Sequence, residues 1–257
     1  MPRLPTTHTM EGMKLRILSY NIHKGFTSLN RDFVLNQIRA ALRASGADVL
    51  FLQEVLGHAH DHLSEDELSI QFEYLADEFW SHYAYGKNAV YHEGHHGNAI
   101  LSRYPITRWS NTALSDGPCE ARGVLKARVQ IPGLGREVLL ANTHLGLTQR
   151  GRDHQVGALV EDLRAEAETS WVLVGDFNDW NRRISPRIER ELGAEEAFKA
   201  LHGRYPVTFP SLWPLLSLDR VFLHNINPLT AEVLWRSPWK SLSDHLPLLV
   251  EVELGAA

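Results

Sequence analysis

Residues 171–179 read WVLVGDFND, an apolar run that stops at a glycine and continues through the polar side chains of Asp176 and Asn178. Apolar runs of about four to seven residues predict strands that are buried on at least one face. The end of such a strand is a place where a rigid sheet can present catalytic groups on a short loop. We therefore expect Asp176 and Asn178 to lie at the end of a buried strand, in a candidate functional site.

The same pattern recurs along the chain. The other apolar runs and their polar neighbours are 15–20 before Asn21, 49–52 before Gln53 and Glu54, 138–141 before Asn142, Leu218 before Asp219, and 246–254 after Asp244 and His245. Each run predicts a further strand with polar residues at one end.

Two segments between these runs have apolar residues at helical spacing. In the first, we expect Asn30 to be the N-cap and Gly46 the terminator. The second helix is predicted over about residues 150–168. The apolar positions are Val34, Ile38, Ala41 and Leu42 in the first helix and Val156, Leu159, Val160 and Leu163 in the second. Each helix has one apolar and one charged face, so each is expected to cover a sheet from outside.

These elements predict a four-layer α/β/β/α sandwich with two mostly antiparallel sheets and the site at one end. The 257 residues, 44% of them hydrophobic, suffice for a large core and exclude a disordered, collagen-like or coiled-coil protein. No repeat or linker divides the chain, so we expect residues 13–257 to form a single domain and residues 1–12 a mobile leader.

Net charge, cysteine content and the distribution of apolar residues bear on the possible partners and the cellular compartment. The net charge of −5 disfavours a protein that coats nucleic acid, although it leaves room for a local basic groove. The single Cys119 cannot form an internal disulfide, which fits a reducing compartment. Without a signal-peptide core or a run of 18 or more apolar residues, we expect a cytoplasmic protein with no stable membrane insertion. We also find no apolar hairpin or basic amphipathic helix that would indicate membrane docking.

Seven segments carry the chemistry. They are SYNIHKG (19–25), LQEV (52–55), GNAILSRYPI (97–106), NTHLGL (142–147), GDFND (175–179), LDRVF (218–222) and SDHLPL (243–248). In this order they resemble the metal-dependent endonuclease/exonuclease/phosphatase superfamily, in particular a compact bacterial branch of it. Any one of these motifs alone is weak, but their joint order along nearly the whole chain after residue 13 is specific.

The residue types suit phosphoester hydrolysis independently of the resemblance. Such an enzyme needs a hard cation, a group that activates water, and donors for the charge that develops on phosphorus. The candidates are the carboxylates of Glu54, Asp176, Asp219 and Asp244, the amides of Asn21 and Asn178, and the imidazoles of His144 and His245. Because oxygen ligands dominate this set, we expect Mg²⁺ or Mn²⁺ rather than structural zinc.

The resemblance also implies a role for each residue. It implies that Glu54 is the principal metal ligand, with Asn21 beside it and Asp244 near the same ion. Asp176 is expected to orient or deprotonate the attacking water. Asn178 is expected to form a hydrogen bond with the water or the phosphoryl oxygens. His245 is expected to contact the scissile phosphate while Asp219 holds its other ring nitrogen. His144 is expected to donate to a non-bridging oxygen, and Arg122 to bind phosphate or brace the site.

Each feature also has a purely structural interpretation. The asparagines could cap turns and Asp219 could form a surface ion pair, but these explanations would have to hold at every position together. His58, His60 and His62 are typical of a solvated loop rather than a metal site. His92, His95 and His96 stand just before GNAILS, a segment that borders the site in the resembling family, and they either contact substrate or lie on a surface loop. Trp213, Trp235 and Trp239 either stack on a substrate group or pack in the core or at its rim.

We therefore expect a phosphodiesterase whose partner is a phosphoester substrate, namely a nucleic acid, a phospholipid or a small diester. The alternatives are a nuclease acting on DNA or RNA, a phosphomonoesterase, a phospholipid hydrolase, and a non-enzymatic scaffold on the same fold. The His after Thr in NTHLGL favours the phosphatase, sphingomyelinase and phosphodiesterase branches over abasic-site endonucleases. No partner protein is implied, and we expect a monomer.

Overall fold

The computed structural model describes residues 12–28, 32–59, 71–76, 79–91, 94–115 and 121–255. These residues form two six-stranded sheets, ordered β11-β12-β1-β2-β4-β3 and β5-β6-β7-β8-β10-β9. The strands of the first sheet are β1 Met13–Asn21, β2 Val49–Ala59, β3 His82–Tyr91, β4 Gly94–Ser102, β11 Asn227–Val233 and β12 Leu248–Leu254. Those of the second are β5 Ile106–Ala113, β6 Gly123–Gln130, β7 Glu137–His144, β8 Trp171–Asp176, β9 Glu195–Glu196 and β10 Asp219–His224.

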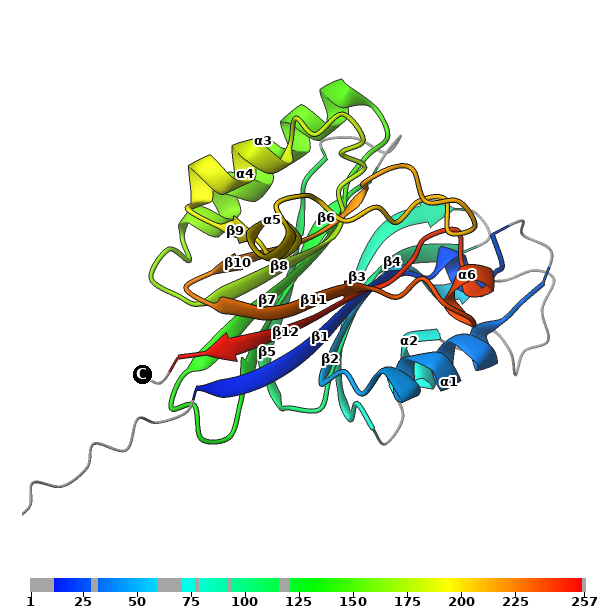
Figure 1. Ribbon diagram of the computed structural model, residues 1–257, viewed down its shortest axis with the longest axis horizontal. Helices are drawn as coiled ribbons and strands as arrows, with labels where there is room; N and C mark the ends of the chain where they lie inside the picture. The colour runs from blue at the N-terminus through cyan, green and yellow to red at the C-terminus, as the bar shows by residue number, and fades with distance from the viewer. Residues whose placement is uncertain are drawn as a thin grey trace, which may run out of the picture.

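Helices cover the outer faces of both sheets, with one exception. The helices are α1 Leu35–Ser45, α2 Gln71–Ala76, α3 Gln149–Arg164, α4 Ser185–Leu192, α5 Ala197–His202 and α6 Trp239–Leu242, with a short 3₁₀ helix, η1, at His23–Gly25. The exception is α5, whose Ala197 and Phe198 pack into the core between the sheets. Helices α1 and α2 lie against the first sheet, and α3 and α4 lie against the second (Figure 1). The predicted four-layer sandwich is confirmed.

Alternation along the strands builds three layers of core. On β1, Ile17 points between the sheets, whereas Leu18 points outward toward α1. On β8, Val174 faces the central core and Leu173 packs under α3 and α4. Because successive side chains of a strand point to opposite faces, a run that is apolar throughout fits a sheet buried on both sides.

The pairing is mostly antiparallel, as predicted. Within each sheet, one central pair is parallel: β1 with β2 in the first, and β7 with β8 in the second. Both pairs have antiparallel partners on either side. The carboxyl ends of parallel strands meet at the same edge of a sheet, so each pair can gather polar side chains at one place.

The helix boundaries differ in part from the prediction. Helix α1 begins at Leu35 and its N-cap position is Val34, so Asn30, which lies outside the described residues, is not the N-cap. The preceding segment is instead held by backbone bonding between residues 26 and 33. Gly46 ends α1 in the left-handed conformation, as expected. Helix α3 ends at Arg164 rather than near residue 168, because turns replace its last predicted turn.

One apolar hairpin contradicts the expectation that the chain has none. Phe209 and Leu216 pair across an antiparallel bridge between α5 and β10, and the backbone N–H of Leu216 donates to Phe209 O at 2.8 Å. We call residues 209–216 the apolar hairpin. Its prolines and the lack of strict alternation hide it in the sequence.

Three of the predictions stay untested. Residues 1–11 of the predicted leader and Cys119 lie outside the described residues, and the extent of the single domain stays a prediction. No described helix is both long enough and apolar enough to cross a membrane.

Candidate active site

Strand ends from both sheets supply the predicted site residues. Asn21 is the last residue of β1, while His144 and Asp176 are the last residues of β7 and β8 and pair with each other in register. Asp219 begins β10 and lies opposite Asp176 in the antiparallel register. The second sheet therefore brings three of the predicted side chains onto neighbouring strands at one end.

A β-bulge positions Glu54. Leu52 and Val55 both face the helix-covered side of the first sheet, and the pairing of β2 with β4 is interrupted between them. Glu54 is the left-handed residue in this bulge, with a φ of 55°. A bulge re-aims a side chain, and a non-glycine residue with positive φ is held only where its surroundings enforce it. The bulge thus turns Glu54 out of the regular alternation and toward Asn21.

Asn21 joins the two sheets. Its Nδ2 lies 3.4 Å from Glu54 Oε1 and 3.3 Å from Asp176 Oδ2, so one amide group contacts a carboxylate of each sheet. Its Oδ1 accepts a hydrogen bond from the backbone N–H of His23 at 3.1 Å. Residues that are 33 and 155 positions from Asn21 in the sequence therefore meet at a single side chain.

A line of polar contacts runs through the second half of the site. His245 Nδ1 lies 2.9 Å from Asp219 Oδ2, and its Nε2 lies 3.7 Å from Asp176 Oδ2. The same Asp176 oxygen lies 3.4 Å from His144 Nε2. All four side chains are buried. The carboxylate of Asp219 fixes the orientation of the His245 ring, which leaves Nε2 directed at the centre of the site.

The same groups have shifted pKa values. Burial raises the pKa of Asp176 to about 6, with the nearby Asp219 and Glu54 adding to the effect and His245 opposing it. Burial alone would lower the pKa of His245, but the carboxylates of Asp219 and Asp176 outweigh it and raise the pKa to about 10. Burial, together with nearby positive groups, holds the pKa of His144 well below its usual value. At neutral pH the site thus contains a protonated His245 and a neutral His144.

The loop after β8 holds Asp176 and Asn178 in place. Asn178 adopts a φ of 48°, its backbone N–H donates to Asp176 Oδ1 at 2.9 Å, and its Nδ2 donates to Leu145 O at 2.9 Å. Gly175 has a φ of 153°, and a Cβ there would lie only 1.9 Å from Thr143 O. Only glycine therefore allows β8 to approach β7 closely enough to set Asp176 beside His144.

The oxygen donors around Asn21 suit a hard divalent cation. Ser243 Oγ donates to Asn21 O at 2.7 Å and to Asp244 Oδ1 at 3.2 Å, which ties Asp244 to the end of β1. Within the part of the chain that the structure describes, no lysine or arginine forms an ion pair with Glu54, Asp176 or Asp244. Carboxylates and amide oxygens without a protein cation are the donor set that Mg²⁺ and Mn²⁺ prefer.

A second group of side chains is close enough together to bind a metal ion, if distance is the only criterion. Ligand atoms of Asp176, Asp219 and His245 lie within 4.8 Å of one another. However, Asp219 accepts from Thr208 Oγ1 at 2.5 Å as well as bonding His245. This arrangement is that of a carboxylate orienting an imidazole, so the Glu54 side stays the predicted place of the metal.

Two positive groups, Lys24 in η1 and Arg122 directly before β6, act on the site together with the His96 imidazole of β4. Arg122, Lys24 and His96 all act to lower the pKa of His144. His96 is buried, and its own pKa is lowered to about 4, chiefly by burial and then by Lys24. The Nε of Arg122 is buried without a hydrogen-bond partner among the described residues. An anionic ligand would supply the hydrogen-bond acceptor that the Nε of Arg122 lacks among the described residues.

The remaining candidate tryptophans and histidines differ in their burial and contacts. Trp239 packs edge-on against Tyr20, whereas Trp213 and Trp235 are exposed. His95 contacts the hydroxyl of Tyr85 at 3.0 Å. His60, His62 and His92, together with the side chain of His58, lie outside what the structure describes.

Sequence reasoning missed Thr208, Ser243 and Lys24. Thr208 is a hydroxyl residue in a loop that no pattern marks, whereas Ser243 opens the motif SDHLPL directly before Asp244 and His245. Lys24 stands in SYNIHKG, shortly after a candidate strand end, and that position was the signal available for it.

Comparisons with known proteins agree with the fold and the motif order. The family model described as Endonuclease/Exonuclease/phosphatase family matches residues 18–245. "Uncharacterized protein YbhP" of Escherichia coli K12 is 43% identical over 244 residues, which cover 93% of this chain and 96% of that protein.

Solved structures show the same fold. An endonuclease/exonuclease/phosphatase from Beutenbergia cavernae superposes with a TM-score of 0.78 at 22% identity, covering 94% of this chain and 72% of that one. The mannosyl-6-phosphatase of Bacteroides thetaiotaomicron gives a TM-score of 0.71 at 18% identity, over 93% of this chain and 99% of that one. The family match over residues 18–245 spans most of the chain. This protein therefore belongs to the endonuclease/exonuclease/phosphatase family, whose members include nucleases, phosphodiesterases and phosphatases.

Proposed function

We propose that this protein is a divalent-metal-dependent phosphoester hydrolase and, within that class, a phosphodiesterase that uses water as the nucleophile. The observation that carries the proposal is the line of contacts from Asp219 through His245 to Asp176, beside His144 and Asn21. A buried acid, a buried base and oriented hydrogen-bond donors within contact distance of one another are the elements that phosphoryl transfer to water requires.

Asp176 is assigned to the attacking water. With a pKa raised to about 6, chiefly by burial, its carboxylate is ionised at neutral pH and still basic enough to orient water and accept its proton. The backbone N–H of Asn178 holds one oxygen of this carboxylate, which leaves the other directed at the two histidines. The side chain of Asn178 is assigned the contact with the water or a phosphoryl oxygen.

His245 and His144 are assigned to the phosphate. The protonated His245 presents its Nε2–H to the scissile group, while Asp219 keeps the ring oriented and stabilises its charge. The neutral His144 donates to a non-bridging oxygen, and Arg122 adds a positive charge nearby. Negative charge grows on the phosphoryl oxygens in the transition state, so these donors act most strongly there.

Glu54 is assigned as the principal ligand of Mg²⁺ or Mn²⁺, with Asn21 beside it and Asp244 near the same ion. When bound, the cation neutralises phosphate oxygens and makes water more acidic. The three residues come from the first sheet and the segment that leads into β12, so they face the catalytic groups of the second sheet across Asn21.

The test is hydrolysis of bis(4-nitrophenyl) phosphate with Mg²⁺ or Mn²⁺ and with excess chelator. We expect turnover with either metal and its loss in chelator, because a phosphate anion would otherwise face a group of carboxylates. His245→Ala should remove activity. His82→Ala should not, because His82 begins β3 at the end of the first sheet that lies away from Glu54.

A substrate panel then separates the alternatives. It contains 4-nitrophenyl phosphate, plasmid, single-stranded DNA, RNA, inositol phosphates and phospholipids. Preference for the monoester would identify a phosphomonoesterase instead. If a metal-loaded protein that is folded hydrolyses no member of the panel, the proposal is wrong and a non-enzymatic role on this fold is supported.

A further inference from the structure

The apolar hairpin exposes large hydrophobic side chains to solvent beside the site. Trp213 is 79% exposed and Leu215 is 78% exposed, and Leu212 and Leu216 are also exposed. Residues 205–218 contain no charged residue. A monomeric protein rarely exposes a contiguous group of this kind, and such groups mark surfaces that meet another apolar surface.

The hairpin is fixed directly to the catalytic residues. Thr208 at its base donates to Asp219 Oδ2 at 2.5 Å, and the Phe209 ring lies 5.0 Å from the His245 ring. The backbone N–H of Ser211 donates to Asp244 O at 2.7 Å. Whatever the exposed tip contacts is therefore held at the mouth of the site.

A pair of cations stands beside the hairpin. Ser211 Oγ donates to Lys240 O at 3.0 Å, which places the start of α6 against the hairpin. Lys240 and Arg236 both lie over the ring of the exposed Trp235, at 5.2 and 5.8 Å from its centroid. Neither cation forms an ion pair within the described residues.

Other apolar side chains stand on loops that follow catalytic residues. Leu147 comes three positions after His144, and Trp180 comes two positions after Asn178, and both are exposed. The site end of the second sheet thus carries exposed apolar side chains on the loops that follow β7 and β8 as well as on the hairpin that precedes β10.

We propose that the apolar hairpin docks on an anionic phospholipid surface, with Trp213 and Leu215 in the acyl region and Arg236 and Lys240 on lipid phosphates. This inference rests on the proposed function and gives it a substrate class, phosphoesters presented at a lipid surface. Exposed Trp and Leu next to Lys and Arg are the composition that lies in the membrane interface.

Single-stranded nucleic acid fits this surface less well. Bases stack on aromatic rings, and a nucleic-acid groove follows the backbone with a track of cations. The hairpin instead presents three exposed leucines beside one tryptophan and has no charge of its own. Aliphatic side chains gain most from transfer into hydrocarbon, so the lipid surface is the better match.

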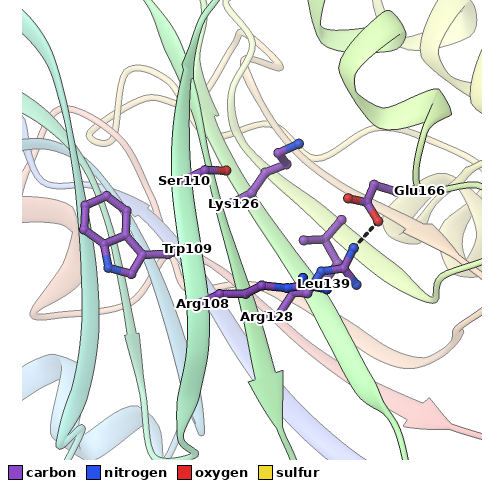
Figure 2. A pocket seen from close by; sticks show the side chains of 7 residues that line it. All are labelled: Arg108, Trp109, Ser110, Lys126, Arg128, Leu139 and Glu166. Atoms are coloured by element: carbon purple, nitrogen blue, oxygen red, sulfur yellow. Dashed lines mark hydrogen bonds and ion pairs between the residues drawn. The ribbon is translucent and has the colours of Figure 1, made fainter.

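A basic hollow elsewhere does not compete for an anionic surface. It has a volume of about 240 Å³ and is lined by Arg108, Lys126 and Arg128, with Glu166 opposite (Figure 2). Lys126 pairs with Asp162 at 2.7 Å, and Arg128 pairs with Glu166. Trp109 points to the other side of its strand from Arg108 and Ser110, away from these charges.

The experiment is sedimentation with vesicles of phosphatidylglycerol and phosphatidylcholine, compared with vesicles of phosphatidylcholine alone. We expect the protein to bind the anionic vesicles, more weakly at high salt. The double variant Trp213→Ser/Leu215→Ser should bind at least about tenfold more weakly, since it loses two apolar side chains from the acyl region. Trp109→Ser is the matched control, because Trp109 is 54% exposed but lies in the middle of β5.

The variants should also separate docking from chemistry. Trp213→Ser/Leu215→Ser should hydrolyse bis(4-nitrophenyl) phosphate at the parental rate and phospholipid in vesicles at a reduced rate. Arg236→Gln/Lys240→Gln should lose the preference for anionic vesicles. If the parental protein does not bind vesicles, or the hairpin variant binds as tightly, the inference is wrong.

Two further outcomes would overturn it in favour of another occupant. Tight binding of single-stranded DNA that the hairpin substitution abolishes would assign the surface to nucleic acid. A parental dimer that the same substitution converts to a monomer, measured by analytical ultracentrifugation, would assign it to a second copy of the chain. Failure of metal-dependent diester hydrolysis would count against the proposed function alone, because vesicle binding is read without turnover.

Discussion

The two sheets share one pattern of strand pairing but differ in what their ends present. Each has a central parallel pair with antiparallel strands on both sides. In the first sheet the pair contributes Asn21 and Glu54, and in the second it contributes His144 and Asp176. A common backbone arrangement thus delivers oxygen donors from one side and acid–base groups from the other.

Asn21 is buried like the second set, so solvent access distinguishes only the carboxylates of the two sets. The side chain of Asp244, beside the first sheet, is 25% exposed, whereas that of Asp176 is 2% exposed. Glu54 is partly exposed as well. A cation can reach the first set from water, while burial shifts the pKa values of the second set. The difference fits the proposed roles, ion binding for Glu54 and Asp244 and proton transfer for Asp176.

The largest expected effect is on kcat in the variant Asp176→Asn, for which Asp179→Asn serves as the comparison. Asp176→Asn should lower kcat by at least about 10²-fold with little change in unfolding free energy, because it removes the group assigned to water. Asp179 accepts from the backbone N–H groups of Ile184 and Ser185 at 2.9 Å and lies 3.8 Å from Arg220. Asp179→Asn should therefore cost about 3 kcal/mol of stability, since it unpairs a buried charge.

Steady-state kinetics with Mg²⁺ and urea unfolding measure both variants. An Asp176→Asn protein that is folded, binds metal and retains the parental rate would show that another group activates water. A kinetic loss that follows unfolding in both variants would remove the distinction between them.

The site residues that border apolar runs could be predicted from the sequence. Those that reach the site only through tertiary contacts could not. Asp176 and Asp219 border strands that local pattern alone identifies. Thr208 acts only because the apolar hairpin folds back onto β10, a contact between loops that no local pattern encodes. His95 and His96 are adjacent, and strand alternation sends only one of them inward, so the sequence alone could not distinguish them.

The second-largest effect concerns a buried carboxylate at the edge of the second sheet. Burial raises the pKa of Glu196 to about 7, and its oxygens accept from the backbone N–H groups of Lys199 and Val221. A carboxyl group with a raised folded-state pKa binds protons more tightly when folded, so its contribution to stability falls as pH rises from about 4.5 to 7. Glu196→Gln lacks this titration.

The free energy of unfolding of Glu196→Gln relative to the parental protein should therefore rise by about 3 kcal/mol between pH 4 and pH 8. Urea unfolding of both proteins across this range measures the difference, in which the titrations of other groups cancel. A difference that does not vary with pH would mean that Glu196 titrates normally in the folded state.

Glu54→Gln tests the first sheet and should act on metal binding. Replacing a carboxylate ligand by an amide should raise the Mg²⁺ concentration for half-maximal activity by about tenfold or more, and added Mg²⁺ should restore part of the rate. Isothermal titration with Mn²⁺ gives the affinity without turnover. If the metal affinity is unchanged and kcat is reduced, Glu54 acts in catalysis rather than in ion binding. The proposed division of roles between the two sheets would then be wrong.

The smallest expected effect belongs to Thr208, which supports the second sheet's imidazole indirectly. Its hydroxyl shares Asp219 Oδ2 with His245 Nδ1, so two donors at 2.5 and 2.9 Å hold one carboxylate oxygen. Thr208→Val keeps the shape and removes one donor, which leaves Asp219 freer to rotate and His245 less firmly oriented. We expect kcat to fall by less than about tenfold and stability to fall by about 1 kcal/mol. Thr208→Ser retains the hydroxyl and should recover the rate, whereas equal loss in both variants would assign the effect to packing against Phe209 rather than to the hydrogen bond.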